Sequence, residues 1–201
     1  MQITGMLWGR KLLDLVEFTH SEVHGPELSV DEIKDMIKRH GQLFIKPMFK
    51  GGVGKKGKSG LLGRVDNISD ALKEKERLYF CEHVDGFNKV KSDGVTYEGA
   101  VPADYEVYFS ITESTEHRSP VMTVTHHGGV DIEELDSDKL AVVPFDPLTG
   151  LKAFHVSNAL MDLGAPPQVI SPLVQNLPKL WDLYNNYGML MLELNPIRMQ
   201  P

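Results

Sequence analysis

A glycine- and lysine-rich segment between residues 44 and 65 carries the residue types best suited to hold a phosphate group. It contains six basic residues and no acidic residue, although the whole chain has a formal net charge of −7. Glycine lets backbone N–H groups approach an anion closely, and lysine supplies compensating charge. The glycines of the segment are Gly51, Gly52, Gly54, Gly57, Gly60 and Gly63. The segment predicts a phosphate-binding loop, and a flexible solvated loop is the alternative.

Two widespread phosphate-binding patterns fit part of this segment. The run GVGKKGKS, residues 52–59, matches the P-loop, and residues 52–57 match the dinucleotide-binding fingerprint. Both patterns need the loop to open a helix. Gly60 and Gly63 would fall in the first turns of that helix, each at a cost of about 1 kcal/mol relative to alanine. We therefore expect the loop to join two strands, and a P-loop NTPase with a helix starting at Lys58 or Ser59 is the alternative.

Hydrophobic periodicity and turn residues predict an α+β (α/β) chain with mixed sheets. The expected helices cover residues 8–18, 29–41, 70–78, 152–163 and 172–186, with capping residues at Ser29, Ser69 and Ser171 and a break at Pro178. The expected strands cover residues 43–49, 61–65, 77–84, 95–101, 105–112, 120–126 and 188–197. The last of these is almost entirely apolar, which predicts a buried strand.

Composition excludes several classes of function. The net negative charge argues against a general nucleic-acid binder, and no apolar run is long enough to span a bilayer. A single cysteine, Cys81, permits no intrachain disulfide and favours a reducing, cytoplasmic location. His126 and His127 are expected to face opposite sides of one strand, so that they could not share a metal ion.

Five stretches, in this order, resemble one family. They are FIKPMFKGGVGKKGKSGLLGRV, YEGAVPADYEVYFSI, THHGGVDIEEL, FDPLTG and LMLELNPI. The chain is similar to the ATP-grasp domain of the succinyl-CoA synthetase β subunit and ATP-citrate lyase (citryl-CoA synthetase) family. That resemblance implies two lobes with mixed or antiparallel sheets flanked by helices, and a nucleotide cleft between them. Residues 19–101 would form the smaller lobe, and residues 102–201 with the helix 1–18 would form the larger one.

The resemblance also implies a nucleotide site. Lys46, on the strand before the loop, would reach the phosphates and act in catalysis, and the backbone of the loop would contact the same phosphates. Two carboxylates and one backbone position would hold the adenine and ribose. The loop contacts would be Gly52, Val53 and Gly54, and the adenosine contacts would be Glu98, Val101 and Glu106.

Glu193 and Asn195 stand out in the apolar run near the C-terminus. Residues i and i+2 of a strand point to one face, and burying both groups without partners would cost several kcal/mol. The resemblance implies that Asn195 binds the nucleotide-associated Mg²⁺ and that Glu193 faces the histidine that becomes phosphorylated. A Glu193 that caps a helix or pairs with a lysine is the alternative.

The function implied is that of an ATP-dependent carboxylate–CoA ligase that uses ATP and Mg²⁺. The γ-phosphoryl group would pass to a histidine of a partner domain or subunit that also binds CoA, for formation or cleavage of citryl-CoA or succinyl-CoA. A hetero- or homo-oligomer is expected, and neither a nucleic acid nor a membrane is an expected partner. The family continues beyond the last strand to an aspartate that binds magnesium, so we expect a fragment, or a subunit that relies on partner chains, that is inactive alone. A non-enzymatic, phosphate-binding scaffold is the third hypothesis.

Overall fold

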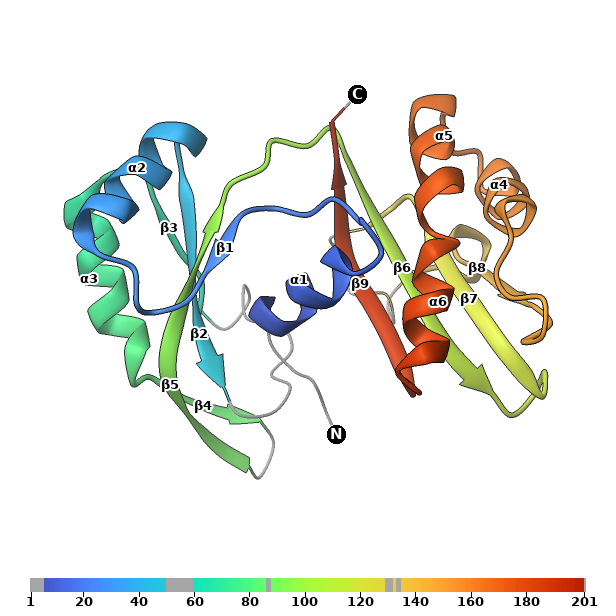
Figure 1. The fold of residues 1–201 in the computed structure, drawn as a ribbon, viewed down its shortest axis with the longest axis horizontal. Helices are drawn as coiled ribbons and strands as arrows, with labels where there is room; N and C mark the ends of the chain where they lie inside the picture. The colour runs from blue at the N-terminus through green and yellow to red at the C-terminus, as the bar shows by residue number, and fades with distance from the viewer. Residues whose placement is uncertain (1–5, 50–59, 86–87, 129–131, 133–134, 201) are drawn as a thin grey trace. The chain divides into compact units, whose positions relative to one another are not determined.

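The chain is described by a computed structural model over residues 6–49, 60–85, 88–128, 132 and 135–200. It divides into two compact units. The first unit comprises residues 1–14 and 19–101, and the second comprises residues 15–18 and 102–201. Each unit combines helices with an antiparallel sheet (Figure 1). The predicted α+β class with antiparallel sheets and flanking helices is confirmed.

The first unit is built on a sheet with strand order β1-β5-β2-β3, in which β4 also pairs with β5. Its elements are α1 (Met6–Asp14), β1 (Val23–His24), α2 (Val30–His40), β2 (Leu43–Phe49), β3 (Gly63–Val65), α3 (Ile68–Tyr79), β4 (Glu82–Asp85) and β5 (Asn88–Gly99). The helix α1, which the resemblance would place in the larger lobe, is grouped with this unit.

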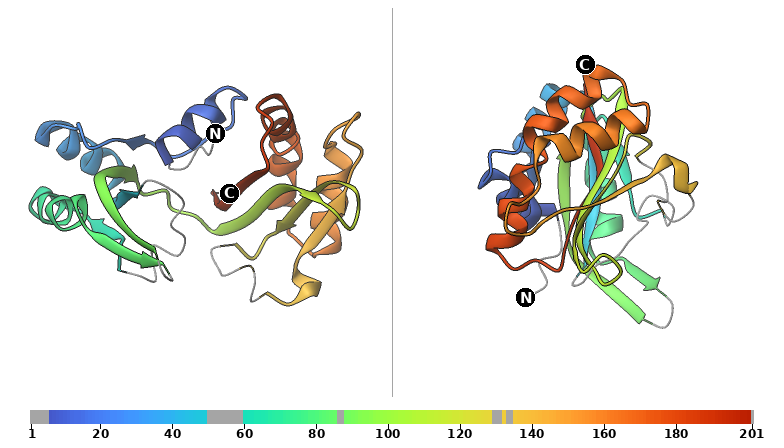
Figure 2. Two further views of the ribbon diagram at one scale, coloured as in Figure 1. Left: turned by 90° about the horizontal axis from the view of Figure 1, so that it is seen from below. Right: turned by 90° about the vertical axis from the view of Figure 1, so that its right-hand side faces the viewer.

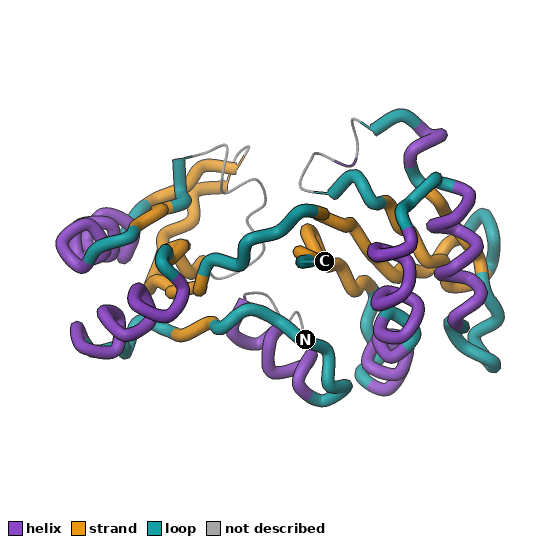
Figure 3. The backbone as a smooth tube through the Cα atoms, turned by 90° about the horizontal axis from the view of Figure 1, so that it is seen from above, coloured by secondary structure: helices purple, strands orange, loops and turns teal. Residues whose placement is uncertain are grey.

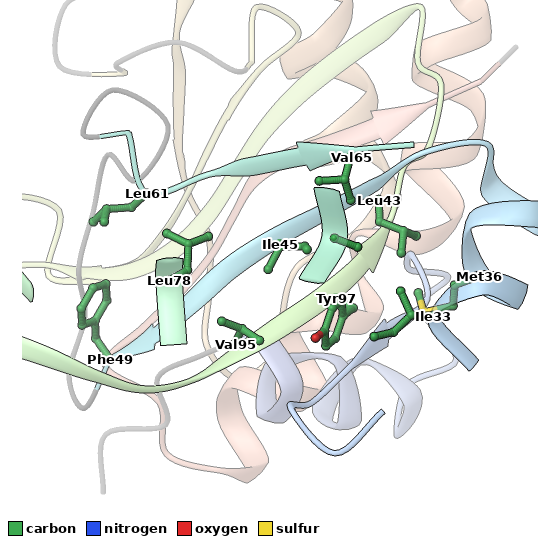
Figure 4. Close-up of a cluster of buried hydrophobic side chains, with 11 residues drawn as sticks. Ile33, Met36, Leu43, Ile45, Phe49, Leu61, Val65, Leu78, Val95 and Tyr97 are labelled. Carbon is green, nitrogen blue, oxygen red and sulfur yellow. The ribbon is translucent and has the colours of Figure 1, made fainter. Parts of the chain in front are cut away.

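The core of the first unit lies between one face of its sheet and the helices α2 and α3 (Figures 3 and 4). β2 alternates between buried and half-buried residues, as expected of a strand with one face on a core. Its buried side chains pack with those of the neighbouring strands and both helices. The members of this cluster are Ile33, Met36, Leu43, Ile45, Phe49, Leu61, Val65, Ala71, Leu78, Val95 and Tyr97. The half-buried residues of β2, which include Lys46, therefore lie on the opposite face of the sheet.

Capping residues set where the helices α2 and α3 begin and where α2 ends. Ser29 and Glu32 form the predicted capping box at the start of α2, and Gly41 ends that helix at a positive φ of 70°. The prediction that Ser69 caps the next helix is wrong. Asn67 is the cap, because its side chain accepts a hydrogen bond from the backbone of Asp70 and α3 begins at Ile68. The helix also extends to Tyr79, so the strand expected over residues 77–84 begins only at Glu82.

The second unit has a sheet with strand order β8-β7-β6-β9, and helices cover one face of it (Figure 2). Its strands are β6 (Tyr105–Ser114), β7 (Ser119–Thr125), β8 (Ala141–Pro144) and β9 (Met191–Met199). Its helices are α4 (Ala153–Asp162), α5 (Pro167–Asn176) and α6 (Lys179–Asn186), with a short 3₁₀ turn η2 at Ser137–Lys139.

Two predictions for this unit are wrong. The helix expected from Pro172 begins at Pro167, which occupies the first helical turn, so Ser171 lies inside α5 and caps nothing. Pro178 does restart the chain as a new helix, as predicted. The last strand was expected to be buried, but β9 pairs only with β6 among the described strands and alternates between exposed and buried residues along its first half. An apolar sequence such as MLML does not distinguish an edge strand from a central one.

Candidate functional site

The glycine–lysine loop connects two neighbouring antiparallel strands. Leu43 of β2 pairs with Val65 of β3, and Ile45 pairs with Gly63. The described residues after the loop contain no helix before Ile68. A P-loop helix would run through Gly63, which is a strand residue, so the P-loop alternative is not supported. The loop residues Gly52, Val53 and Gly54 lie outside the described residues.

Lys46 and Glu98 meet on the face of the sheet opposite to α2 and α3. The Lys46 ammonium donates a hydrogen bond to Glu98 Oε2 at 2.5 Å. Lys46 pairs with Thr96 and Phe44 pairs with Glu98, so the two charged residues are diagonal neighbours on one face. The structure thus brings together a predicted phosphate-binding lysine and a predicted adenosine-binding carboxylate.

Glu98 receives two further hydrogen bonds from outside the sheet. Arg10 Nη2 of α1 lies 2.9 Å from Glu98 Oε1, and the hydroxyl of Ser21 donates to the same oxygen at 2.6 Å. Glu98 is only 9% exposed. Burial raises the pKa of Glu98, but the charge and hydrogen bond of Lys46, the Ser21 hydroxyl and the Arg10 charge together hold it below its ordinary value. Glu98 is therefore ionised and firmly held at neutral pH.

This arrangement limits how Glu98 could contact a ligand. An ionised carboxylate oxygen accepts about two hydrogen bonds, and Oε1 already receives those of Arg10 and Ser21. Oε2 receives that of Lys46 and retains capacity for one more donor.

The other predicted adenosine contacts lie near the point in the sequence where the chain passes from the first unit to the second. Val101 is the last residue of the first unit, and Glu106 belongs to β6 of the second unit. The carboxylate of Glu106 is 2.8 Å from Arg198 Nη2, on the neighbouring strand β9. Gly128 donates its backbone N–H to the carbonyl of Glu106 at 2.7 Å, so Gly128 packs against this part of β6.

Glu193 and Asn195 are both exposed on β9. Leu192 is buried and Leu194 is half-buried, in agreement with the expected alternation. Glu193 pairs with Ser110 of β6, but the register shifts between Leu194 and Ile197, so Asn195 lies at an irregularity of the ladder. The two side chains carry oxygen atoms of the kind that Mg²⁺ prefers.

The two adjacent histidines do not behave as the sequence predicted. β7 ends at Thr125, one residue before them, and the two rings lie with centroids 4.1 Å apart. The expectation that they face opposite sides was wrong because they follow the strand and are not part of it. Burial lowers the pKa of His126, and the neighbouring His127 lowers it further. No group of three or more His, Cys, Asp or Glu residues that could hold a metal ion occurs within the described part of the chain.

Sequence reasoning missed Arg10 and Ser21. They precede Glu98 by 88 and 77 residues, and neither belongs to a recognisable motif. The half-apolar stretch around Arg10 indicated a helix, but helical periodicity does not tell which strand a long polar side chain will reach.

A comparison with family models decides the family. A model described as an ATP-grasp domain matches residues 18–199. The chain belongs to the ATP-grasp family. The resemblance read from the five sequence stretches is therefore confirmed.

The ATP-grasp domain is similar to curated β subunits of ADP-forming succinate–CoA ligase. The protein from Desulfatibacillum aliphaticivorans is 28% identical over 178 residues, which cover 86% of this chain and 46% of that protein. The protein from Staphylothermus marinus is 30% identical over 146 residues, which cover 70% of this chain and 38% of that protein. The chain spans about half or less of the length of these relatives.

Solved structures agree with the fold. The ATP citrate lyase of Methanothrix soehngenii, solved with citrate and coenzyme A, aligns with a TM-score of 0.70 at 20% identity, over 97% of this chain and 45% of that one. The dinucleotide-forming acetyl-coenzyme A synthetase 1 of Ca. Korarchaeum cryptofilum aligns with a TM-score of 0.70 at 14% identity, over 94% of this chain and 84% of that one. Among the described residues, no helix of the ATP-grasp domain has the length and apolar character needed to cross a bilayer.

Proposed function

We propose that this ATP-grasp domain is the nucleotide-binding part of an ATP-dependent carboxylate–CoA ligase. The single observation that carries the proposal is the position of Lys46. It lies on β2, directly before a glycine–lysine loop that joins two antiparallel strands, and on the face of the sheet opposite to α2 and α3. The similarity to β subunits of succinate–CoA ligase supports the choice of ligase class.

Lys46 is proposed to bind the nucleotide phosphates together with the backbone of Gly52, Val53 and Gly54. The lysine ammonium has three donors, so it can hold Glu98 and a phosphate oxygen at once. Positive charge placed beside the transferring γ-phosphoryl group supplies much of the catalysis in this class of reaction. Lys46 therefore combines a binding role with a catalytic one.

The adenosine part of ATP is assigned to Glu98, Val101 and Glu106. The carbonyl and N–H of Val101 suit the hydrogen-bonding edge of adenine, and the carboxylate of Glu106 is an acceptor for ribose hydroxyls. Glu98 keeps one acceptor position on Oε2, so its contribution to the ligand is at most one hydrogen bond beside its contact with Lys46.

Mg²⁺ is assigned to Asn195, with Glu193 close by. Mg²⁺ is commonly bound by one or two protein oxygens together with water and substrate phosphates, so the exposed oxygens of these two residues fit such a partial site. When bound, the ion would offset negative charge on the phosphates. Glu193 is proposed to face the histidine that receives the phosphoryl group.

The remaining steps are proposed to take place on a partner domain or subunit. Its histidine would accept the γ-phosphoryl group, and CoA would give the thioester, with citrate or succinate as the candidate acid. We propose a hetero- or homo-oligomer in the cytoplasm, and that this chain does not turn over alone.

Nucleotide-induced thermal stabilisation tests the proposal. A ligand that binds the folded state alone raises the melting temperature as its concentration rises above Kd. We expect MgATP to stabilise the wild-type chain and to lose most of this effect with Lys46→Ala. Ser59→Ala should retain it, because the P-loop hydroxyl has no role in this account.

Lys73→Ala is the matched control, because Lys73 is also a lysine of the first unit but pairs with Asp70 on the exposed side of α3. Stabilisation that survives Lys46→Ala, or that is lost equally with Lys73→Ala, would reject the proposal. If stabilisation by MgATP is lost with Ser59→Ala but not with Lys46→Ala, the P-loop alternative would be supported.

A further inference from the structure

Glu106 and Arg198 face each other across two neighbouring strands of the second unit. They are direct partners in the antiparallel ladder of β6 and β9, so their side chains lie on the same face of the sheet. Arg198 Nη2 lies 2.8 Å from Glu106 Oε1. The ion pair uses one oxygen of the carboxylate, and the other oxygen keeps its capacity to accept hydrogen bonds from a ligand. The guanidinium therefore restricts the rotamers of the glutamate without blocking it.

The backbone of Glu106 is held by a second contact. Gly128 donates its N–H to the Glu106 carbonyl at 2.7 Å. A Cβ atom added to Gly128 would lie 2.7–2.8 Å from backbone atoms of Glu106 and Val107, which is closer than real Cβ contacts. Any residue other than glycine would thus require the backbone to shift here. Both the main chain and the side chain of Glu106 are therefore fixed by neighbours within the second unit.

The exposure of the ion pair indicates what it can contribute. The side chains of Arg198 and Glu106 are 40% and 31% exposed. An ion pair that is open to solvent adds little to the stability of a fold. It can still restrict a flexible glutamate before a ligand arrives, which reduces the conformational entropy that is lost on binding. The pair is therefore better suited to orienting the carboxylate than to stabilising the unit.

We infer that Arg198 is a positioning residue for ribose recognition, which holds the Glu106 carboxylate in the orientation that accepts hydrogen bonds from the ribose hydroxyls. The inference rests on the proposed function, in which Glu106 contacts the ribose. Arg198 acts through Glu106 and does not need to touch the nucleotide. Its effect should therefore depend on whether the nucleotide carries ribose hydroxyls.

The test is isothermal titration of the whole chain with MgATP and with the magnesium complex of dideoxy-ATP, which lacks both ribose hydroxyls. Wild type should bind MgATP about tenfold more tightly, because the dideoxy nucleotide forgoes these hydrogen bonds. Arg198→Gln should reduce this preference to about threefold by weakening MgATP alone. Its melting temperature without nucleotide should stay within about 2 °C of wild type, because the pair is exposed.

Further variants of the pair test the route through Glu106. Arg198→Lys keeps a cation opposite the carboxylate and should hold the preference within about twofold of wild type. Glu106→Ala should abolish the preference, and adding Arg198→Gln to it should cause no further loss, because the two residues act as a unit. Arg198→Met keeps the apolar stem of the side chain and replaces Arg198→Gln should that variant fail to fold, with the same expected result.

Lys89→Gln is the matched control. Lys89 also forms an ion pair with a glutamate on the neighbouring antiparallel strand, because it lies 2.7 Å from Glu82 between β5 and β4. Neither residue has a role in the proposed nucleotide site. Lys89→Gln should leave both affinities, and therefore the preference for MgATP, as in wild type.

The outcomes separate this inference from the proposed function. If Glu106→Ala abolishes the preference for MgATP but Arg198→Gln retains it, the inference is overturned and the proposed function stands. The inference is also overturned if Arg198→Gln weakens both nucleotides equally, or if Lys89→Gln reduces the preference as much. If wild type binds both nucleotides alike, the ribose contact of Glu106 and the inference fail, whereas the phosphate contacts stand. If wild type does not bind MgATP, the proposed function and the inference fail together.

Discussion

Lys46 and Glu98 lie 52 residues apart in sequence, and the lysine ammonium is 2.5 Å from the carboxylate. They are not direct partners in the ladder but diagonal neighbours on β2 and β5, with one residue pair between them. The intervening residues of each strand, Ile45 and Tyr97, point to the other face and into the core. One sheet thus carries a core on one face and a charged cluster on the other.

The core face predicts a large effect of truncating Ile45. Its side chain is fully buried between β2 and the helices, so Ile45→Ala should lower the free energy of unfolding by about 2–5 kcal/mol. Ile45→Val, which removes one methylene, should cost about 1 kcal/mol. Chemical denaturation measures both values. Equal effects of the two substitutions would show that the site is not tightly packed.

Tyr97 offers a substitution that is expected to stabilise the protein. Its hydroxyl is buried and has no hydrogen-bond partner among the described residues, and burial raises its pKa to about 12. Removing an unsatisfied polar group while keeping the ring should not destabilise the protein. We expect Tyr97→Phe to raise the free energy of unfolding by up to about 1 kcal/mol. A loss of more than this amount would mean that the hydroxyl has a partner.

The start of α3 distinguishes two neighbouring polar residues. Asn67 accepts a hydrogen bond from the backbone of Asp70 at 2.9 Å, whereas Ser69 lies inside the helix. Asn67→Ala should therefore cost about 1 kcal/mol, and Ser69→Ala should be nearly neutral or slightly stabilising, because alanine is the better helix former. Denaturation of both variants measures these costs, and a larger loss of stability with Ser69→Ala than with Asn67→Ala would show that Ser69 is the cap.

Glu22 predicts a pH-dependent contribution to stability. Burial raises its pKa, but hydrogen bonds from His40, His24 and Arg39, with the charge of Arg39, lower it to about 2 from an ordinary value of 4.5. A lowered folded-state pKa stabilises the protein above the unfolded-state value, and this stabilisation is lost as the pH falls from 4.5 towards 2.

Glu22→Gln removes that contribution. The side chain of Glu22 is 30% exposed, so solvent screening reduces the expected loss at neutral pH to about 1–2 kcal/mol. The difference between wild type and variant should shrink as the pH is lowered from about 5 to about 3. Denaturant titrations across this range measure it, and a difference that stays constant or grows would refute the assignment.

Much of the fold follows from local sequence signals. The capping box at Ser29 and the alternation of LFIKPMF gave α2 and β2 correctly, because both depend on residues close together in the chain. Predictions failed where two local signals compete. Asn67 and Ser69 are both suited to capping, and Pro167 and Pro172 are both suited to a first helical turn, so local signals alone do not decide where α3 and α5 begin.

The sequence does not specify the connections of the candidate site. The role of Lys46 is implied by the family resemblance and stays a prediction, whereas the two strands joined by the glycine–lysine loop are adjacent as predicted. The bonds from Arg10 and Ser21 to Glu98 depend on how α1 and the segment before β1 return to the sheet. The hydrophobic periodicity of these two segments does not specify where they pack on the sheet.

A crystal structure of the chain with Mg²⁺ and a non-hydrolysable ATP analogue tests the central claim most directly. The account predicts triphosphate oxygens about 3 Å from the Lys46 ammonium, with the loop after β2 contacting them through backbone N–H groups and Asn195 bound to the ion. Phosphates held at the start of a helix opened by residues 52–59, or bound away from Lys46, would contradict it.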